Sequence, residues 1–195
     1  MTRPLDAKTL FKQKFGFTPT HLARVPGRIE LLGNHTDYNE GLVLALAVDK
    51  YVSLASSPRS DGKIELVSSA FPGRELFWLS EFKKNPDAPW TDYVKGMLDA
   101  LRRHGVAFSG FSAAIHSTIP MGAGLGSSGA LAIATALAVR QLHPCKFTSI
   151  GATPLPRTRG KTRMALPPLS KKEKFILARL CQSAENRFVG VGSIC

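Results

Sequence analysis

The glycine-rich stretch at residues 120–130, PMGAGLGSSGA, carries the residue types best suited to holding a phosphate group. Gly122, Gly124 and Gly126 can take backbone dihedrals that other residues avoid, so successive N–H groups can point into one concavity. An alanine-rich segment follows, and the positive N-terminal end of a helix there would add to the attraction. We therefore expect this loop to bind an anionic polyphosphate.

The residues around the loop bear on other interpretations of its glycines. No Asp or Glu occurs between Asp99 and Glu173, so no nearby carboxylate repels a nucleotide. The loop is not a Walker loop, because no Lys follows its last glycine. Residues 124–129 spell GxGxxG, but the acid that a dinucleotide site needs about 20 residues later is absent. A glycine-rich turn that only reverses the chain remains an alternative.

A second stretch, residues 26–41, concentrates hydrogen-bonding side chains between two apolar runs. Asp37 accepts, His35 can do either, and Asn34 can both donate and accept, which suits the hydroxyl groups of a sugar. Arg28 adds a permanent positive charge. The alternative is that Asn34, Asp37 and the threonine between them only cap a helix or close a turn.

Together the two stretches resemble the galactokinases of the GHMP kinase superfamily, whose motifs read approximately GRxNLIGEHTDY and PxGxGLxSSA. The resemblance is close over residues 22–142 and resumes over residues 169–191, which are similar to the family's next helix and its AEN-x-FxGV ending. It implies an α/β fold of the α+β type, in which a mixed sheet carries helices on one side. It also implies an N-terminal domain, with the family's second domain absent from these residues.

The resemblance assigns roles to four residues of the second stretch. Arg28 matches the arginine near the anomeric hydroxyl and the transferring phosphoryl group, where it would offset negative charge. Asn34, His35 and Asp37 match sugar-binding positions. Galactokinases usually have Glu where Asn34 stands, so the preferred sugar is left open.

The resemblance also implies ATP and Mg²⁺ as cofactors and galactose as substrate. Ser128 and Glu185 match the metal-binding hydroxyl and carboxylate, which suffice because Mg²⁺ keeps water and phosphate as its other ligands. Without the family context, Glu185 is better interpreted as a solvated helix residue. The loop around the triphosphate is matched by Gly122, Ala123, Gly124, Leu125, Gly126, Ser127 and Ser128.

Two departures from the family pattern bear on activity. Residues 147–168 have no counterpart and are expected to be an insertion in a mobile loop. The family's GIMDQ-like segment, whose Asp is the catalytic acid/base, is replaced after Val191 by Gly-Ser-Ile-Cys. The chain is therefore expected to be an inactive N-terminal fragment. The alternatives are a non-catalytic sugar- or nucleotide-binding remnant and a GHMP kinase for another sugar.

Composition sets outer limits on these interpretations. The 195 residues are 44% hydrophobic, enough for one domain with a core, and the longest apolar run, 129–139, is too short to span a bilayer. The first residues do not resemble a signal peptide and three cysteines make no disulfide framework, so a cytoplasmic protein is expected. Most of the net charge of +12 lies in residues 144–195, without the aromatic spacing of nucleic-acid binders. Neither nucleic acid nor a membrane is expected as partner, and the oligomeric state is left open.

Residue patterns predict the elements that must position these motifs. Strands are expected near 22–25, 29–32, 42–55, 64–68, 75–79 and 111–119, and helices at 90–104, 128–142 and 170–188. Ser170 and Glu173 predict a capping box at the start of the last helix. Three regions follow: a sugar- and ATP-binding domain over 1–143, an irregular insertion over 144–168, and a continuation of the domain over 169–195.

Overall fold

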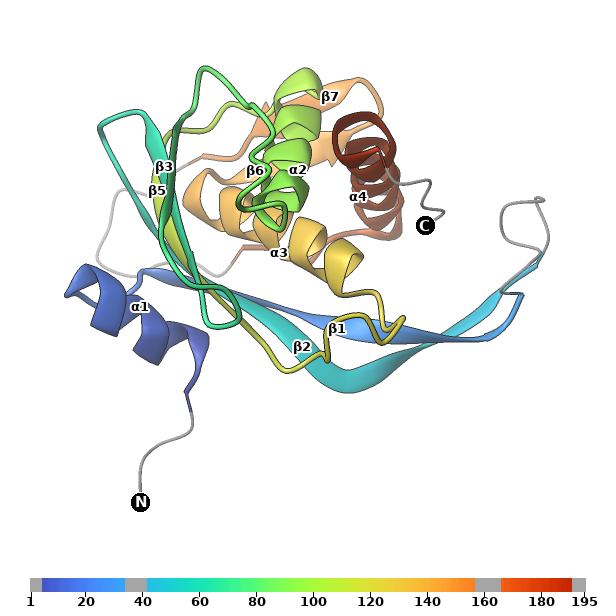
Figure 1. Cartoon of the computed structure of the whole chain (residues 1–195). Helices are drawn as coiled ribbons and strands as arrows, with labels where there is room; N and C mark the ends of the chain where they lie inside the picture. The colour runs from blue at the N-terminus through green and yellow to red at the C-terminus, as the bar shows by residue number, and fades with distance from the viewer. Residues whose placement is uncertain (1–4, 34–41, 157–165, 191–195) are drawn as a thin grey trace.

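The computed structural model describes residues 5–33, 42–156 and 166–190, and its centre is a five-stranded mixed sheet (Figure 1). The strand order is β1-β2-β5-β3-β4. Only β3 and β5 pair in parallel, and the other neighbours are antiparallel. The strands are β1 (His21–Leu32), β2 (Leu44–Pro58), β3 (Lys63–Ser68), β4 (Glu75–Trp78) and β5 (Phe111–Ser117). The predicted mixed sheet is confirmed.

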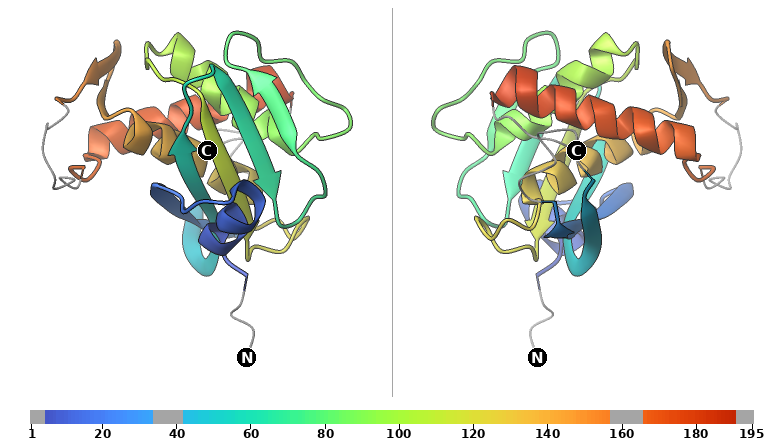
Figure 2. Two further views of the ribbon diagram at one scale, coloured as in Figure 1. Left: turned by 90° about the vertical axis from the view of Figure 1, so that its left-hand side faces the viewer. Right: turned by 90° about the vertical axis from the view of Figure 1, so that its right-hand side faces the viewer.

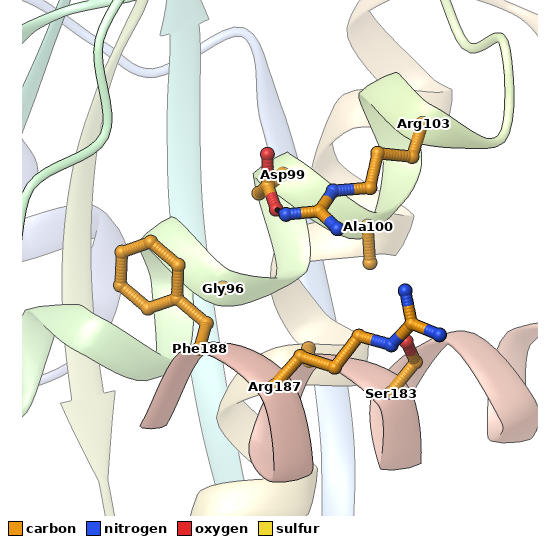
Figure 3. Close-up of a pocket in the computed structure, with 8 residues that line it drawn as sticks. Gly96, Asp99, Ala100, Arg103, Ser183, Arg187 and Phe188 are labelled. Atoms are coloured by element: carbon orange, nitrogen blue, oxygen red, sulfur yellow. Dashed lines mark ion pairs between the residues drawn. The ribbon is translucent and has the colours of Figure 1, made fainter. Parts of the chain in front are cut away.

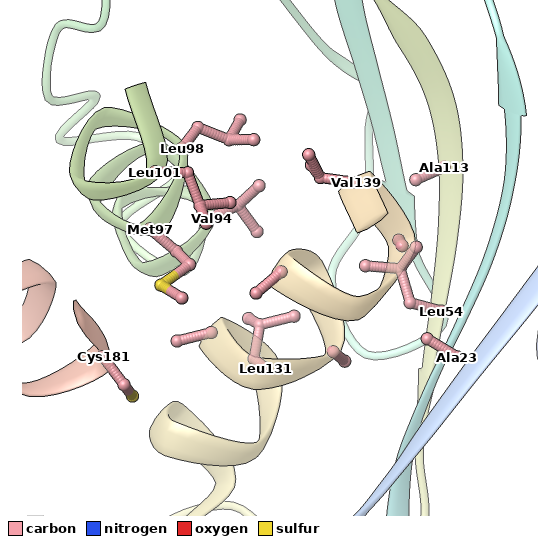
Figure 4. Packing of buried hydrophobic residues seen from close by; sticks show 14 of the residues in the cluster. Ala23, Leu54, Val94, Met97, Leu98, Leu101, Ala113, Leu131, Val139 and Cys181 are labelled. Carbon is pink, nitrogen blue, oxygen red and sulfur yellow. The ribbon is translucent and has the colours of Figure 1, made fainter. Parts of the chain in front are cut away.

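Three helices cover one face of this sheet, namely α2 (Thr91–Arg103), α3 (Ser127–Leu142) and α4 (Lys171–Ala184) (Figures 1 and 2). The alanine-rich α3 lies between the sheet and the other two helices, and its small side chains let it approach both. Figure 4 shows Leu131 and Val139 of α3 between Leu54 of the sheet and Met97 of α2. This layer is the main hydrophobic core.

The fourth helix, α1 (Ala7–Phe15), packs on the opposite face of the sheet and was not predicted. Its Leu10 and Phe11 are buried with Ala55, Val67 and Ala114, which alternate with the residues that face the main core. Asp6 caps the helix by accepting from the Thr9 N–H at 2.7 Å. The short apolar stripe is too weak a signal without the sheet that covers it.

The first two predicted strands, 22–25 and 29–32, form one continuous strand, β1. β1 runs through Pro26 and Gly27, where two separate strands were expected, and a register shift against β2 absorbs the irregularity. Beyond this point β2 no longer pairs with β5, and β1 and β2 form a two-stranded ribbon that extends past the rest of the sheet (Figure 1). Two cross-strand aliphatic pairs, Ile29 with Leu46 and Leu32 with Leu44, remain exposed on it.

The region expected to be irregular contains an antiparallel hairpin, β6 (Cys145–Thr148) and β7 (Gly151–Pro154). Buried Arg140 donates to the Cys145 carbonyl at 3.1 Å, and the Phe147 N–H donates to Glu173 Oε1 at 3.3 Å. These bonds tie the hairpin to α3 and to the start of α4. The expectation of irregular structure is therefore wrong for these ten residues, while residues 157–165 lie outside the described part.

Helix α4 begins with the predicted capping box: Ser170 accepts from the Glu173 N–H, and Glu173 accepts from the Ser170 N–H. Its end differs from the prediction. The α-helix stops at Ala184, and the chain continues as a π-helix, η2 (Glu185–Val189), which closes at Gly190 with φ 85°.

Among the described helices, none has the length and apolar character needed to cross a bilayer.

Candidate functional site

The glycine-rich loop joins the end of β5 to the start of α3. Gly122, Gly124 and Gly126 have φ of 70°, 69° and 68°, which confirms the predicted left-handed backbone at all three positions. Helix α3 begins at Ser127, one residue earlier than predicted, and neither a capping side chain nor an acidic residue occupies its first turn. The positive end of α3 therefore faces the loop without a competing anion.

Arg28 is held against this loop by its own backbone. Its N–H donates to the Leu125 carbonyl at 2.9 Å, which joins β1 to the glycine-rich loop. A Cβ built on Gly126 would lie 3.1 Å from Arg28 Cγ, so the arginine side chain crosses the loop where a side chain on residue 126 would stand. The structure thus brings together two motifs that lie almost 100 residues apart in the sequence.

Gly27 makes this close approach possible. A Cβ on Gly27 would lie 2.7 Å from the Leu125 carbonyl oxygen and 3.0 Å from Ile119 Cδ1, closer than real Cβ contacts. Arg28 itself is exposed, and no ion pair is formed with it in the ranges that the structure describes. Its guanidinium therefore stands beside the loop without a carboxylate partner among the described residues.

The sugar-binding prediction falls on residues that are not described. Asn34, His35 and Asp37 lie in the segment 34–41 that connects β1 to β2, outside the described ranges. The described ends of this segment approach one another: a Cβ on Gly33, which has φ 99°, would lie 2.6 Å from the Leu42 carbonyl oxygen. The roles of these three residues remain predictions.

Glu185 is buried, contrary to the interpretation as a solvated helix residue. It is 4% exposed, and its Oε1 has no hydrogen-bond partner among the described atoms. One turn earlier, Cys181 Sγ lies 3.9 Å from the Gly129 carbonyl, which puts the helix that carries Glu185 beside the first turn of α3 and its Ser128. A buried carboxylate oxygen without a partner is costly, and a bound cation would offset that cost.

Tyr93 of α2 also belongs to this neighbourhood and was missed by sequence reasoning. Burial raises the pKa of its phenol, and the carboxylates of Glu185 and Asp92 raise it further. Gly96, one turn along α2, was missed as well. A glycine inside a helix is unfavourable unless close packing requires it, and this was the signal that the sequence offered.

Comparison with known proteins finds a match for each of the two sequence stretches that the Arg28–Leu125 bond joins. Residues 9–58 match the galactokinase galactose-binding signature, and residues 92–155 match the N-terminal domain of GHMP kinases. The galactokinases of Roseiflexus sp. and Homo sapiens are each 34% identical to this chain. Each alignment covers 95% of the chain, but only 41% and 42% of those relatives. The chain thus spans about two fifths of the length of the curated relatives it matches.

The fold comparison agrees with the sequence comparison. A crystal structure of Lactococcus lactis galactokinase complexed with galactose matches the chain with a TM-score of 0.73 and 29% sequence identity. The match covers 95% of this chain and 42% of that one. The signature match includes Arg28, and the domain match includes the whole glycine-rich loop. Over 95% of its length, the chain is thus similar to part of the galactokinases, and it carries matches to both the galactokinase signature and the GHMP kinase N-terminal domain.

Proposed function

We propose that this chain provides the sugar- and nucleotide-binding part of an enzyme that transfers the γ-phosphoryl group of ATP to the C1 hydroxyl of galactose. The observation that carries the proposal is the bond between the Arg28 N–H and the Leu125 carbonyl. It fixes the backbone of Arg28 beside a loop suited to phosphate, at the junction of the two family motifs. The galactose-binding signature and the relative's galactose complex support the choice of sugar.

Each part of the loop would have a definite task. Backbone N–H groups of residues 122–128 and the first turn of α3 would hold the triphosphate, since glycine leaves the concavity open. Arg28 would stabilise the charge that develops on the transferring group. Asn34, His35 and Asp37 would orient the sugar hydroxyls through hydrogen bonds.

The residues present fit a magnesium ion bound together with the triphosphate. Ser128 and Glu185 would contribute one hydroxyl and one carboxylate, and the unpartnered Glu185 Oε1 is the observation in favour. No cluster of three His, Cys, Asp or Glu side chains exists in the described residues, so a cage built from protein alone is not available there. When bound, Mg²⁺ would neutralise phosphate charge.

We further propose that a polypeptide of these 195 residues phosphorylates galactose only weakly. The acid/base Asp that the family resemblance assigns has no counterpart in residues 191–195. Without a carboxylate to accept the C1 hydroxyl proton, binding would persist while transfer is slow.

The division of the chain into three regions, with boundaries after residues 143 and 168, also remains a prediction.

Calorimetry and an ADP-release assay test these proposals. The unmodified chain should bind Mg-ATP and galactose, and Arg28→Ala should weaken binding of Mg-ATP. Arg24→Ala is the matched control, because Arg24 is an exposed arginine of the same strand that lies over the Tyr51 ring, away from the loop. Equal effects of the two substitutions would contradict the role of Arg28. Turnover near 1 to 100 s⁻¹ by the unmodified chain would contradict the missing-carboxylate argument.

A further inference from the structure

Glu185 occupies an uncommon backbone setting. It is the first residue of the π-helix η2, whose closing bond runs from the Gly190 N–H to the Glu185 carbonyl at 2.9 Å. Single π-turns inside helices are rare and are frequent at functional sites. Because a π-turn rotates the residues around it relative to a continuous α-helix, whatever holds the turn also sets the direction of the Glu185 carboxylate.

Gly96 of α2 is the first of two contacts that hold this turn. A Cβ on Gly96 would lie 3.0 Å from Phe188 Cβ and 3.1 Å from the Ala184 carbonyl oxygen. Figure 3 shows Gly96 facing Phe188 across the shallow cleft between α2 and η2. The carbonyl belongs to the residue before Glu185, so a side chain at position 96 would displace the backbone that carries the carboxylate.

Lys84 makes the second contact, at the other end of the turn. Its Nζ donates to the Val189 carbonyl at 3.0 Å, across a separation of 105 residues. Val189 is the last residue of η2, where carbonyl groups lack partners within the helix. A lysine at a helix C-terminus also interacts favourably with the helix dipole. The turn is thus fixed at both ends by segments outside its own helix.

One partly buried carboxylate, that of Glu75, anchors both of these segments. Glu75 Oε1 accepts from Lys95 Nζ at 2.9 Å, and Lys95 precedes Gly96. The Asn85 side-chain amide donates to Glu75 Oε2 at 3.0 Å, and Asn85 follows Lys84. The Lys95 side chain is only 2% exposed and that of Glu75 is 17% exposed, so the ion pair is largely shielded from solvent. The two contacts on η2 are therefore parts of one fixed support.

We propose that Gly96 and Lys84 are positioning residues that hold the π-turn in the geometry in which Glu185 directs its carboxylate at the metal of a bound Mg-nucleotide. This inference rests on the proposed function. Neither residue touches nucleotide or metal; each acts through the backbone of η2. Supporting contacts around a metal ligand are typically worth 10- to 100-fold in metal affinity.

The test compares the affinity for Mg-ATP with that for metal-free ATP, by calorimetry on the 195-residue chain. Gly96→Ala and Lys84→Met should weaken binding of Mg-ATP by about 10- to 100-fold and leave binding of metal-free ATP unchanged. Glu185→Gln should show the same selectivity. Lys84→Arg retains a cationic donor and should restore most of the loss.

Two control variants separate positioning from general destabilisation. Lys83→Met removes the neighbouring lysine, which is exposed and pairs only with Glu81 in the described residues. Ala100→Gly weakens α2 one turn from Gly96 without adding an atom against η2. Both controls should bind the two forms of ATP like the unmodified chain.

A second measurement does not depend on nucleotide. The Glu185 carboxylate contributes to the raised pKa of Tyr93, so the pKa of this phenol should fall in Gly96→Ala and Lys84→Met, as in Glu185→Gln. NMR of ring-labelled tyrosine follows it. Equal losses for Mg-ATP and metal-free ATP, or an unchanged affinity for Mg-ATP, would overturn the positioning role. Failure of the unmodified chain to bind Mg-ATP would instead contradict the proposed function.

Discussion

The two sides of the candidate site are built in different ways. The glycine-rich loop takes its shape from its own residues: Gly122 and Gly124 have positive φ, and a Cβ on either would meet no atom within 4 Å. The opposite side, the turn that carries Glu185, takes its shape from distant segments, through Gly96 and Lys84. Local backbone chemistry therefore accounts for the glycines of one side, which is joined to β1 at Leu125, and tertiary packing determines the other side.

This difference explains which site residues could be predicted from the sequence. A run of glycines before an alanine-rich helix has a local physical meaning, so the loop and its backbone dihedrals were predicted correctly. The burial of Glu185 depends on α2 and α3, which no local pattern around it reveals. Substitutions in the two sides should accordingly fail in different ways.

The largest effect is expected from breaking the contacts that support the turn carrying Glu185. Glu75→Ala leaves the Lys95 ammonium, 2% exposed, without its carboxylate, and breaking a buried pair in this way costs about 3 to 5 kcal/mol. Urea unfolding measures the loss. Glu81→Ala, which removes the exposed pair with Lys83, should change the unfolding free energy by less than about 1 kcal/mol. Similar losses of unfolding free energy in both variants would show that the Lys95–Glu75 pair stabilises the fold no more than an exposed ion pair does.

The second-largest effect is expected in the glycine-rich loop. Gly124→Asp puts a side chain at φ 69° and a carboxylate into the phosphate concavity, so Mg-ATP affinity should fall at least 100-fold, or about 2.7 kcal/mol. Gly124→Asn is the matched control, since Asn tolerates this backbone and carries no charge. Retention of the original affinity by a folded Gly124→Asp chain would place the nucleotide elsewhere.

A smaller effect should separate sugar binding from both sides. Asn34→Glu restores the charged acceptor usual in galactokinases and should strengthen galactose binding by about 1.5 to 3 kcal/mol, with Mg-ATP affinity unchanged. Asn34→Gln controls for side-chain length. If the galactose affinities of the unmodified chain and of Asn34→Glu, measured by calorimetry, differ by less than threefold, this position has no role in sugar binding.

The smallest effect concerns the start of α4, where a purely local motif carries the helix that ends at Glu185. Ser170→Ala removes the capping box and should cost about 1 kcal/mol in unfolding free energy at neutral pH. Leu169→Ala, outside the cap, serves as a comparison for packing loss alone. Mg-ATP affinity should stay constant, since η2 is fixed by its own contacts rather than by the far end of its helix.

The same cap predicts a dependence on pH. Burial acts to raise the pKa of Glu173, but hydrogen bonds from Ser170 and Phe147 and the charge of Arg140 outweigh it, so the pKa lies below its usual value. A carboxyl with a lowered folded-state pKa stabilises the fold above its unfolded pKa and loses this contribution as pH falls through the folded one. Glu173→Gln should flatten the acid limb of the stability profile. An unchanged limb would assign it to other carboxylates.

The fold itself was predictable where a segment carries its own pattern. Helix α2, the predicted strand feeding the loop, and the capping box of α4 each follow from residue spacing or paired polar residues. Helix α1 and the β6–β7 hairpin escaped prediction because their stability comes from partners. Phe11 needs the outer sheet face, and the hairpin needs the buried charges of Arg140 and Glu173.

The bond between the Arg28 N–H and the Leu125 carbonyl also has a consequence for motion. Since Gly27 and Gly126 leave no gap between the strand and the loop, we expect the two segments to move together, so that any shift of the loop would carry Arg28 with it. Exchange of the Arg28 amide hydrogen with solvent requires this bond to open. The exchange rate of the Arg28 amide hydrogen therefore reports how often the loop separates from β1. A ligand that holds the loop against β1 should slow this exchange.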